Sequence, residues 1–357
     1  MKIDLSTHRE LQEQGLISIQ KHPEFPLLIH NYTQRCQWDR AWNDITLQCR
    51  GLITDLSGKV ICRPFRKFFN LGEHTSPESI LPPINWKQSY RVTEKIDGSL
   101  GIAYPTPSGE YRMATRGSFV SEQAIRGTEM LRKLNHYFSP NATYLFEIIY
   151  PENRIVVDYG GVEELILLDI IDNFTGLSLN REMLEDIAGL MSCRAVRRHS
   201  LSVEELMRYS SNEPNREGVV VLFVDGTRIK IKLEEYCRLH KLITGVNARH
   251  IWEYLRDGKS LEELIDRVPD EFMSWVNRTA TDLLCEAARI EESANGIFAE
   301  IKQGLGNAPR KEYALAFEPH LTLRPILFLL LDGRPIHQAI WKQLRPEGVT
   351  TFAVADE

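Results

Sequence analysis

The stretch that decides the fold is Tyr90-Arg91-Val92-Thr93-Glu94-Lys95-Ile96-Asp97-Gly98-Ser99-Leu100-Gly101-Ile102-Ala103-Tyr104. It consists of two strand-like runs joined by a polar segment that contains Lys95, and Asp97 with Gly98 favours a turn there. A lysine in water has a pKa of roughly 10.4, and its protonated amine cannot attack an electrophile. Because desolvation or nearby cations can lower that pKa, Lys95 is a candidate nucleophile. Taken alone, a Lys-x-Asp-Gly segment favours an ordinary solvated turn over a catalytic site.

Similar strand-like runs occupy most of the first two-thirds of the chain, and two helical stretches interrupt them. This mixture predicts an α+β fold in which antiparallel sheets carry helices on their outer faces. The expected strands are residues 90–94, 100–104, 144–149, 165–171, 218–223 and 228–232, with a hairpin over 51–64; the expected helices are 121–138 and 180–190.

The last third of the chain has a different pattern, because apolar residues there recur at helical rather than strand spacing. We therefore predict two domains, residues 1–243 and 244–357, with the boundary near 239–247 and an all-helical second domain. Its tryptophans are expected to pack between helices. The expected helical segments are 251–255, 261–265, 272–276, 279–303, 321–331 and 335–344.

Composition and charge narrow the class of protein. The net charge is −6, so a nucleic-acid partner would need a local basic cleft within an acidic molecule. None of the six cysteines forms a C-x-x-C pair, which argues against a zinc site and for reduced thiols in the cytoplasm. The most apolar run, residues 326–331, is far shorter than the roughly 20 residues of a membrane span.

Four further groups of charged residues favour a chemical role for Lys95. Glu147 interrupts an apolar strand, and Glu217 precedes another. Lys230 and Lys232 alternate along a strand, so both amines project from the same face. Upstream, cations and aromatic residues gather around Arg50 and in residues 63–70. Together these residues suit nucleotidyl transfer, in which cations and a metal ion offset the charge of a polyphosphate while a lysine attacks it.

Read in order, Lys95-Ile96-Asp97-Gly98, Phe146-Glu147, Glu217-Gly218 and Lys230-Ile231-Lys232 resemble the motifs of the covalent nucleotidyltransferases, which include DNA ligases, RNA ligases and mRNA-capping enzymes. Additional segments are similar to the bacteriophage tRNA-repair type of ATP-dependent RNA ligase. They are Cys49-Arg50-Gly51, Lys67-Phe68-Phe69-Asn70, Thr115-Arg116-Gly117-Ser118 and the run from Lys230 to Tyr236. The resemblance covers roughly residues 45–245.

This resemblance implies a nucleotidyltransferase core, ATP-grasp-like in fold, that joins RNA ends carrying a 5′-phosphate and a 3′-hydroxyl. Lys95 would take AMP from ATP, with Mg²⁺ or Mn²⁺ as the metal, and pass it to the RNA. Glu147 would contact the ribose, and Glu217 would serve the metal or the lysine. Asp97 would orient the amine or a ribose hydroxyl. The implied metal ligands are Glu217 and Glu147, and the implied ATP-binding residues are Arg50, Lys67, Phe69, Glu94, Lys95, Ile96, Gly98, Arg116, Glu147, Lys230, Lys232 and Tyr236.

Two other kinds of protein remain open at this stage. One is a DNA-sealing or capping nucleotidyltransferase, although the last third lacks the strand pattern of the OB-fold that follows their cores. The other is a non-catalytic RNA-binding module. For the favoured hypothesis, the helical domain is expected to select the RNA substrate, cleaved tRNA being one candidate. A separate kinase or phosphatase that prepares the ends is a candidate partner.

Overall fold

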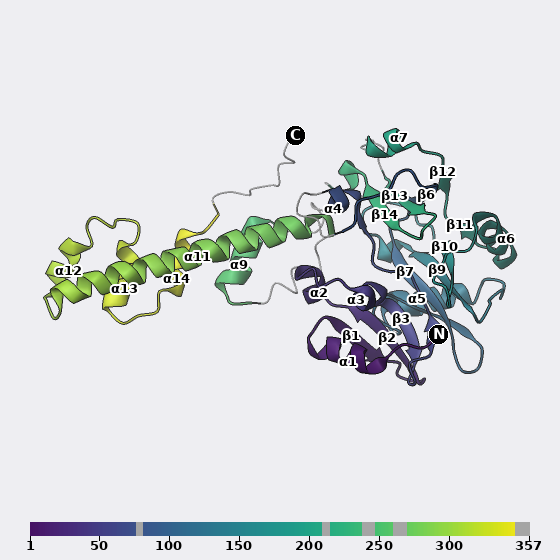
Figure 1. Cartoon of the computed structure of the whole chain (residues 1–357), viewed down its shortest axis with the longest axis horizontal. Coiled ribbons are helices and arrows are strands. Elements are labelled where there is room, and N and C mark those ends of the chain that lie inside the picture. The colour runs from purple at the N-terminus through teal and green to yellow at the C-terminus, as the bar shows by residue number, and fades with distance from the viewer. Residues whose placement is uncertain (76–80, 209–214, 238–246, 260–269, 347–357) are drawn as a thin grey trace. The chain divides into compact units, whose positions relative to one another are not determined.

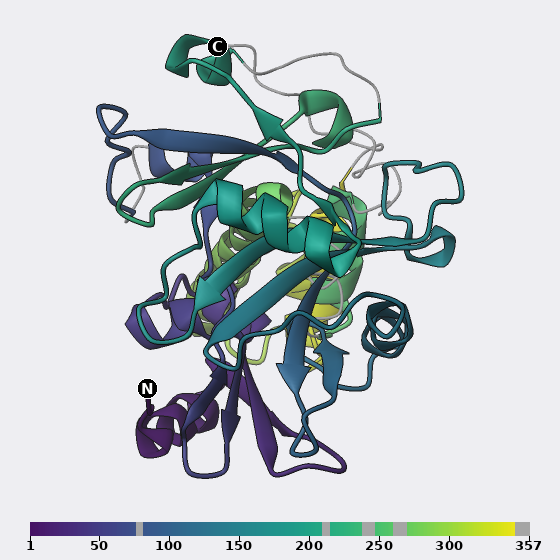
Figure 2. The same cartoon turned by 90° about the vertical axis from the view of Figure 1, so that its right-hand side faces the viewer.

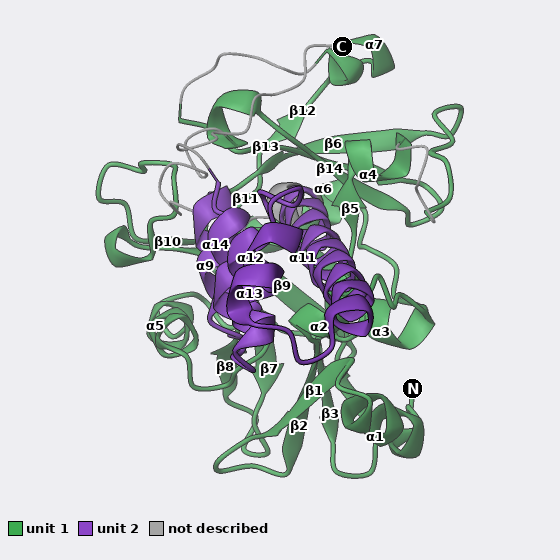
Figure 3. Ribbon diagram, turned by 90° about the vertical axis from the view of Figure 1, so that its left-hand side faces the viewer, with its two compact units in different colours: residues 1–243 green, residues 244–357 purple. Residues whose placement is uncertain are grey.

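The computed structural model describes residues 1–75, 81–208, 215–237, 247–259 and 270–346. The chain forms two compact units, Met1–Ile243 and Thr244–Glu357, which Figure 3 shows in two colours. The domain boundary was predicted within residues 239–247, and residues 239–246 of that segment lie outside the described residues. The predicted helical segment 261–265 also lies outside them.

The first sheet of unit 1 is antiparallel throughout, with the strand order β1-β2-β3-β4. The predicted hairpin is confirmed, because β3 and β4 pair directly. Three short helices accompany this sheet (Figure 1). The elements are α1 (Leu5–Glu13), β1 (Ile17–Lys21), β2 (Leu27–Tyr32), α2 (Gln34–Trp38), α3 (Asp44–Gln48), β3 (Arg50–Asp55) and β4 (Val60–Cys62).

The second sheet has the order β11-β10-β9-β7-β8, and helices α5 and α6 contribute to its largest apolar core. Met130 and Leu131 of α5 and Leu184 of α6 are buried with Phe146 and Ile148 of β9. The elements are β7 (Ser99–Pro105), β8 (Tyr111–Ala114), α5 (Glu122–Leu131), β9 (Ala142–Ile149), a 3₁₀ turn (Pro151–Asn153), β10 (Glu164–Asp172), α6 (Arg181–Met191) and β11 (Arg194–Ala195).

The third sheet has the order β12-β6-β13-β14-β5. Val92, Val219, Val221 and Ile229 form its apolar face, so the alternate residues, Lys230 and Lys232 among them, point to the opposite face. Figure 2 gives a second view of these sheets. The elements are β5 (Phe69–Asn70), α4 (Leu71–Thr75), β6 (Tyr90–Lys95), β12 (Arg198–His199), α7 (Val203–Met207), β13 (Gly218–Phe223) and β14 (Arg228–Lys232).

The predicted α+β class is confirmed, with two corrections of detail. The second and third sheets are mixed, because β10 pairs in parallel with β11 and β14 in parallel with β5. The helix expected over residues 121–138 ends at Leu131. Beyond it, the backbone and side-chain N–H groups of Asn135 donate to the carbonyls of Met191 and Leu190. Asn135 thus donates to carbonyl groups that have no partner within α6 at its C-terminal end, and the chain does not continue α5.

Unit 2 is helical over its described residues, as predicted. Trp252 of α9 and Trp341 of α14 are both 4% exposed, and the Trp252 indole N–H donates to the Trp341 carbonyl at 2.7 Å. They therefore act as packing residues, as expected. No described helix is both long enough and apolar enough to cross a membrane. The elements are α9 (Ala248–Arg256), α11 (Asp270–Leu305), α12 (Arg310–Ala316), α13 (Arg324–Leu331) and α14 (His337–Gln343).

Candidate active site

Three adjacent strands bring Lys95, Glu217 and Lys232 together. In the ladder of the third sheet, Gly218 lies opposite Lys95 on one side and Lys232 on the other. The Glu217 carboxylate beside it forms ion pairs with Lys95 Nζ at 2.7 Å and Lys232 Nζ at 3.1 Å. Glu217 Oε2 accepts no well-directed hydrogen bond, so its contact with Lys95 is an ion pair. One buried carboxylate thus holds two lysines that lie far apart in the sequence.

Gly218 is required for this arrangement. Its φ of +153° is rarely adopted by residues with a side chain, and an added Cβ would lie 2.1 Å from the carbonyl oxygen of Ile231. Strand β14 would have to move away to make room. The Glu217-Gly218 pair therefore places a carboxylate at a point where β13 and β14 approach unusually closely.

Glu147 supplies a second buried carboxyl group to the site. It lies in β9 of the facing sheet and is 8% exposed. Burial raises its pKa to about 8; the positive charge of Lys95 opposes this shift, and the negative charges of Glu217 and Asp97 add to it. The neutral carboxylic acid is therefore favoured at neutral pH, and such a group can both donate and accept a hydrogen bond.

Gly98 allows the loop after Lys95 to lie against this carboxyl group. A Cβ at Gly98 would lie 2.8 Å from the Ile148 carbonyl oxygen and 3.0 Å from Glu147 Cγ. The glycine of the Lys-x-Asp-Gly segment is thus needed for close packing against β9.

Asp97 contacts the protein itself. Its Oδ2 accepts hydrogen bonds from the backbone N–H groups of Val156 (2.9 Å) and Val157 (2.8 Å). Its Oδ1 accepts one from the Tyr236 hydroxyl at 2.7 Å. We expected Asp97 to orient the amine or a ribose hydroxyl and Tyr236 to shape the nucleotide pocket. The contacts give Asp97 an anchoring role, in which it ties Tyr236 and the loop after β9 to the Lys95 segment.

A row of cations follows β14 on the face opposite its apolar side. Lys230 is buried, and Lys232 Nζ lies 5.1 Å from the centre of the Tyr236 ring. Arg228, two residues before Lys230, donates to Asp169 at 2.7 Å and stacks at 4.0 Å over Phe65. Sequence reasoning missed Arg228, although its alternation with the two lysines is visible in the sequence.

The upstream cations form a group with aromatic rings. Lys67 Nζ lies between 5.4 and 5.7 Å from the centres of the Tyr32, Trp42 and Phe69 rings. Arg116 donates to the Tyr32 hydroxyl at 2.9 Å. Tyr32 and Trp42 were not predicted, because nothing in their own segments indicates a contact with Lys67.

Arg50 connects this group to the carboxylates. It lies opposite Asn31, next to Tyr32, in the pairing of β3 with β2. Its positive charge also lowers the pKa of Glu147 against the effect of burial. Arg50 therefore acts on Glu147 by its charge from a strand that pairs with the one carrying Tyr32.

The two remaining predicted residues flank Lys95 and have different surroundings. Ile96 is buried among Ile149, Ile166 and Val196. Glu94 forms an ion pair with Arg216 at 3.4 Å. Neither contact bears directly on a nucleotide, and their assignment to ATP stays a prediction.

The oxygen donors of this site suit Mg²⁺ or Mn²⁺ better than a soft metal. Glu147 and Glu217 lie close enough for each to influence the other, and a cation between them would favour the ionised form of Glu147. Among the described residues there is no cluster of three metal-binding side chains. Two carboxylates are nevertheless enough for Mg²⁺, which usually keeps several waters and binds substrate phosphates.

The RNA ligase family model matches residues 48–236, more than half of the chain, and the chain belongs to this family. A protein named "Putative RNA ligase" from Thermovibrio ammonificans is 32% identical over 210 residues, which is 55% of this chain and 54% of that protein. The chain thus spans about half the length of this relative. The RNA ligase of Rhodothermus phage RM378 is 23% identical over 385 residues, covering 86% and 85% of the two chains. Among solved structures, an archaeal ATP-dependent RNA ligase aligns over 82% of this chain and 80% of its own with 16% identity and a TM-score of 0.47.

Proposed function

We propose that this chain is an ATP-dependent RNA ligase that joins a 5′-phosphate to a 3′-hydroxyl through AMP bound to Lys95. The observation that carries the proposal is the pairing of Lys95 and Lys232 with the single buried carboxylate of Glu217. Membership of the RNA ligase family supports RNA as the substrate.

In the first step, Lys95 Nζ forms a bond to the α-phosphorus of ATP, and the bond from that phosphorus to the bridging oxygen breaks and releases pyrophosphate. The attacking nitrogen must lose a proton, and Glu217 Oε2, at 2.7 Å, is within reach to accept it. Glu217 was expected to serve either the metal or the lysine, and this short distance supports a role toward the lysine. Glu147 and Glu217 would hold Mg²⁺ or Mn²⁺, which would withdraw charge from the α-phosphate when bound.

Lys230 and Lys232 would bind the phosphates near Lys95, and Arg50, Lys67 and Arg116 would bind those farther out. The aromatic rings around Lys67 hold its amine without neutralising it, since cation–π contacts leave the positive charge available. The two roles of Glu147 are alternatives: its neutral form would hydrogen-bond to the ribose, and its ionised form would bind the metal.

In the second step, an oxygen of the RNA 5′-phosphate attacks the phosphorus of the bound AMP. The P–N bond breaks, and Lys95 recovers a proton. In the third step, the 3′-hydroxyl oxygen attacks the RNA phosphorus, which forms the phosphodiester and releases AMP. We further propose that unit 2 selects the RNA, that cleaved tRNA is one substrate in the cytoplasm, and that a separate kinase or phosphatase prepares the ends.

Incubation with α-labelled ATP and Mg²⁺ tests the proposal. Label should become attached to the wild-type chain and be lost in Lys95→Ala, while Lys21→Ala, which removes an exposed lysine, keeps it. Absence of label from the wild type with both Mg²⁺ and Mn²⁺ would contradict the proposal. AMP transfer to nicked DNA but to no RNA end would indicate a DNA-sealing enzyme.

A further inference from the structure

A loop after β9 is fixed to the segment that carries Lys95. Besides the two hydrogen bonds from Val156 and Val157 to Asp97, the hydroxyl of Tyr159 accepts a hydrogen bond from the Asp97 backbone N–H at 2.9 Å. The loop therefore keeps its position relative to the nucleophile, because Asp97 follows Lys95 by only two residues and their Cα atoms cannot be more than roughly 7 Å apart.

A second attachment joins the same loop to the segment before Glu217. The Asn215 side chain accepts a hydrogen bond from the Asp158 N–H and donates one to the Asp158 carbonyl, both at 2.6 Å. Asn215 itself has a φ of +63°, a left-handed conformation that asparagine tolerates better than most residues. Both the lysine and the carboxylate of the site are thus connected to one rigid loop.

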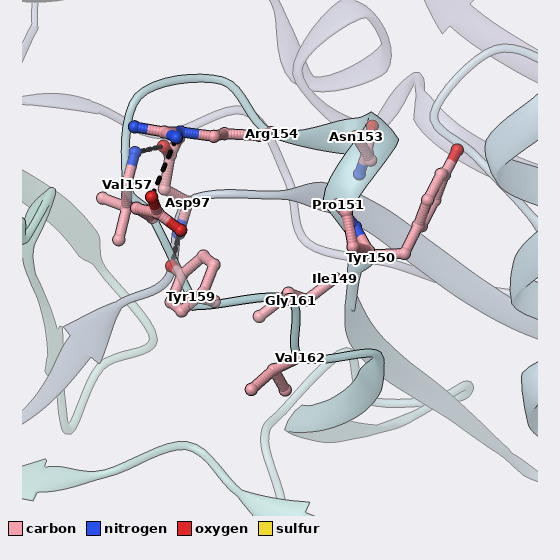
Figure 4. A pocket seen from close by; sticks show the side chains of 11 residues that line it. Asp97, Ile149, Tyr150, Pro151, Asn153, Arg154, Val157, Tyr159, Gly161 and Val162 are labelled. Carbon is pink, nitrogen blue, oxygen red and sulfur yellow. Dashed lines mark hydrogen bonds and ion pairs between the residues drawn. The ribbon is translucent and has the colours of Figure 1, made fainter.

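This loop encloses a cavity of about 140 Å³ beside Asp97 (Figure 4). Its volume is below the roughly 300 Å³ at which pockets for drug-sized ligands begin, so it suits a phosphate with part of its sugar better than a whole nucleotide. Among the described residues that line it, Arg154 is the only cation. The cavity therefore combines a preformed shape, a position beside Asp97, which follows the nucleophile by two residues, and a single positive group among its described lining residues.

The second chemical step, the transfer of AMP to the RNA 5′-phosphate, needs a positively charged group. A 5′-phosphate carries a charge of roughly −1.5 to −2 at pH 7 and has to approach the phosphate of the bound AMP, which is also negative. The lysines around Lys95 are already engaged by Glu217 or assigned to ATP. An additional cation at the RNA end would offset the repulsion between the two phosphates.

Arg154 is able to change partners. Its guanidinium forms an ion pair with Asp158 at 2.9 Å, and both side chains are 54% exposed. An exposed ion pair contributes little to stability, so exchanging Asp158 for a phosphate costs little. A guanidinium can also bind a phosphate through two parallel hydrogen bonds, which a lysine cannot do.

We propose that this cavity receives the 5′-phosphate end of the RNA and that Arg154 binds the phosphate there. This inference rests on the proposed function. In the transfer step Arg154 holds the attacking phosphate but exchanges no proton or bond with it. Asp158 competes with the phosphate for the guanidinium.

Binding of one oligoribonucleotide with either a 5′-phosphate or a 5′-hydroxyl to the full-length chain, without ATP, tests the inference. The wild type should prefer the 5′-phosphate by about tenfold or more, the ratio expected for a charge-assisted contact. Arg154→Ala should lose this preference, and Asp158→Asn should increase it. Asparagine removes the negative charge that competes for Arg154, which keeps its hydrogen bonds to the Val156 carbonyl oxygen, and it can still accept the Gly160 N–H that Asp158 Oδ1 accepts. Arg132→Ala is the matched control, because Arg132 is 53% exposed and ion-paired with Glu110.

The opposite effects of the two substitutions separate phosphate binding from a structural role. If the ion pair only stabilises the loop, both variants lose it and should change binding in the same direction. That result, or a wild type that binds both RNAs equally, would overturn the inference. Attachment of AMP to Lys95 is measured separately on the wild type and on the same variants and should be equal in all of them. Its absence from the wild type would count against the proposed function, whereas its loss in Arg154→Ala alone would overturn the present inference.

Discussion

The two units of this chain differ in what they bury. Unit 1 encloses charged side chains, among them Lys67, Asp97, Glu147, Glu217 and Lys230, whereas the described residues of unit 2 bury apolar and aromatic side chains only. Burying a charge is costly unless a partner compensates for it, and apolar replacements often give an equally stable fold. We infer that unit 1 retains most of these charges for chemistry, whereas apolar packing accounts for the buried side chains described in unit 2.

The largest expected effect is in unit 1, at the close contact beside Glu217. Gly218→Ala should lower the free energy of unfolding by roughly 3 kcal/mol or more, because the new Cβ overlaps the Ile231 carbonyl and the backbone conformation is unfavourable. Chemical denaturation measures this change. Gly189→Ala is the control, since a Cβ there meets nothing within 4 Å. Equal stability of the two variants would show that β13 and β14 do not approach as described.

A second effect comes from the buried carboxyl group. Because the pKa of Glu147 is raised to about 8, the folded chain holds a proton that the unfolded chain releases at lower pH. The stabilisation from this proton is complete below the unfolded pKa, near 4.5, and is lost as the pH rises through 8. Glu147→Gln removes this dependence, so its free energy of unfolding relative to the wild type should rise as the pH increases over that range.

Thermal or chemical unfolding of both proteins at pH 5 and pH 8 measures the difference. If the difference is the same at both pH values, Glu147 does not bind a proton as its burial requires.

A smaller effect is expected when unit 2 is removed. A chain of residues 1–243 should keep AMP attachment, because every predicted site residue lies in unit 1. Joining of RNA ends should fall by about tenfold or more, equivalent to roughly 1.4 kcal/mol of lost RNA binding. Labelled-adenylate and end-joining assays on the same preparation measure both. Undiminished joining of every RNA tested would exclude unit 2 from substrate selection.

The smallest effect is expected in unit 2. Gly296 lies within α11, and an added Cβ would meet nothing within 4 Å. Alanine is favoured over glycine in a helix by up to about 1 kcal/mol, so Gly296→Ala should stabilise unit 2 by roughly 0.5–1 kcal/mol without changing AMP attachment. Calorimetry detects this change. A loss of stability would mean that Gly296 is needed for a contact made by the helix.

Sequence reasoning located the strands of the site well, because their apolar alternation is regular. Residues 218–223 and 228–232 are strands over their whole predicted lengths. The ordered motifs also pointed to Lys95, Glu217 and Lys232, which neighbouring strands bring together. Such motifs are informative because each residue type is set by the reaction and not by packing alone.

The remaining features depend on contacts between distant segments. The partners of Asp97 lie 59 to 139 residues away, and those of Lys67 include the rings of Tyr32 and Trp42 in two upstream segments. No local pattern specifies such contacts. The burial of Glu147 could not be predicted from its own segment either, since a single carboxylate in an alternating strand more often faces solvent. It is buried here because β9 lies in the middle of its sheet and faces the Lys95 segment.

Peptide mapping of the chain after incubation with ATP and Mg²⁺ tests the central claim most directly. The account predicts one AMP per chain, attached to the peptide that contains Lys95 and released when RNA with a 5′-phosphate is added. AMP on a different residue, or on none while RNA ends are still joined, would contradict it.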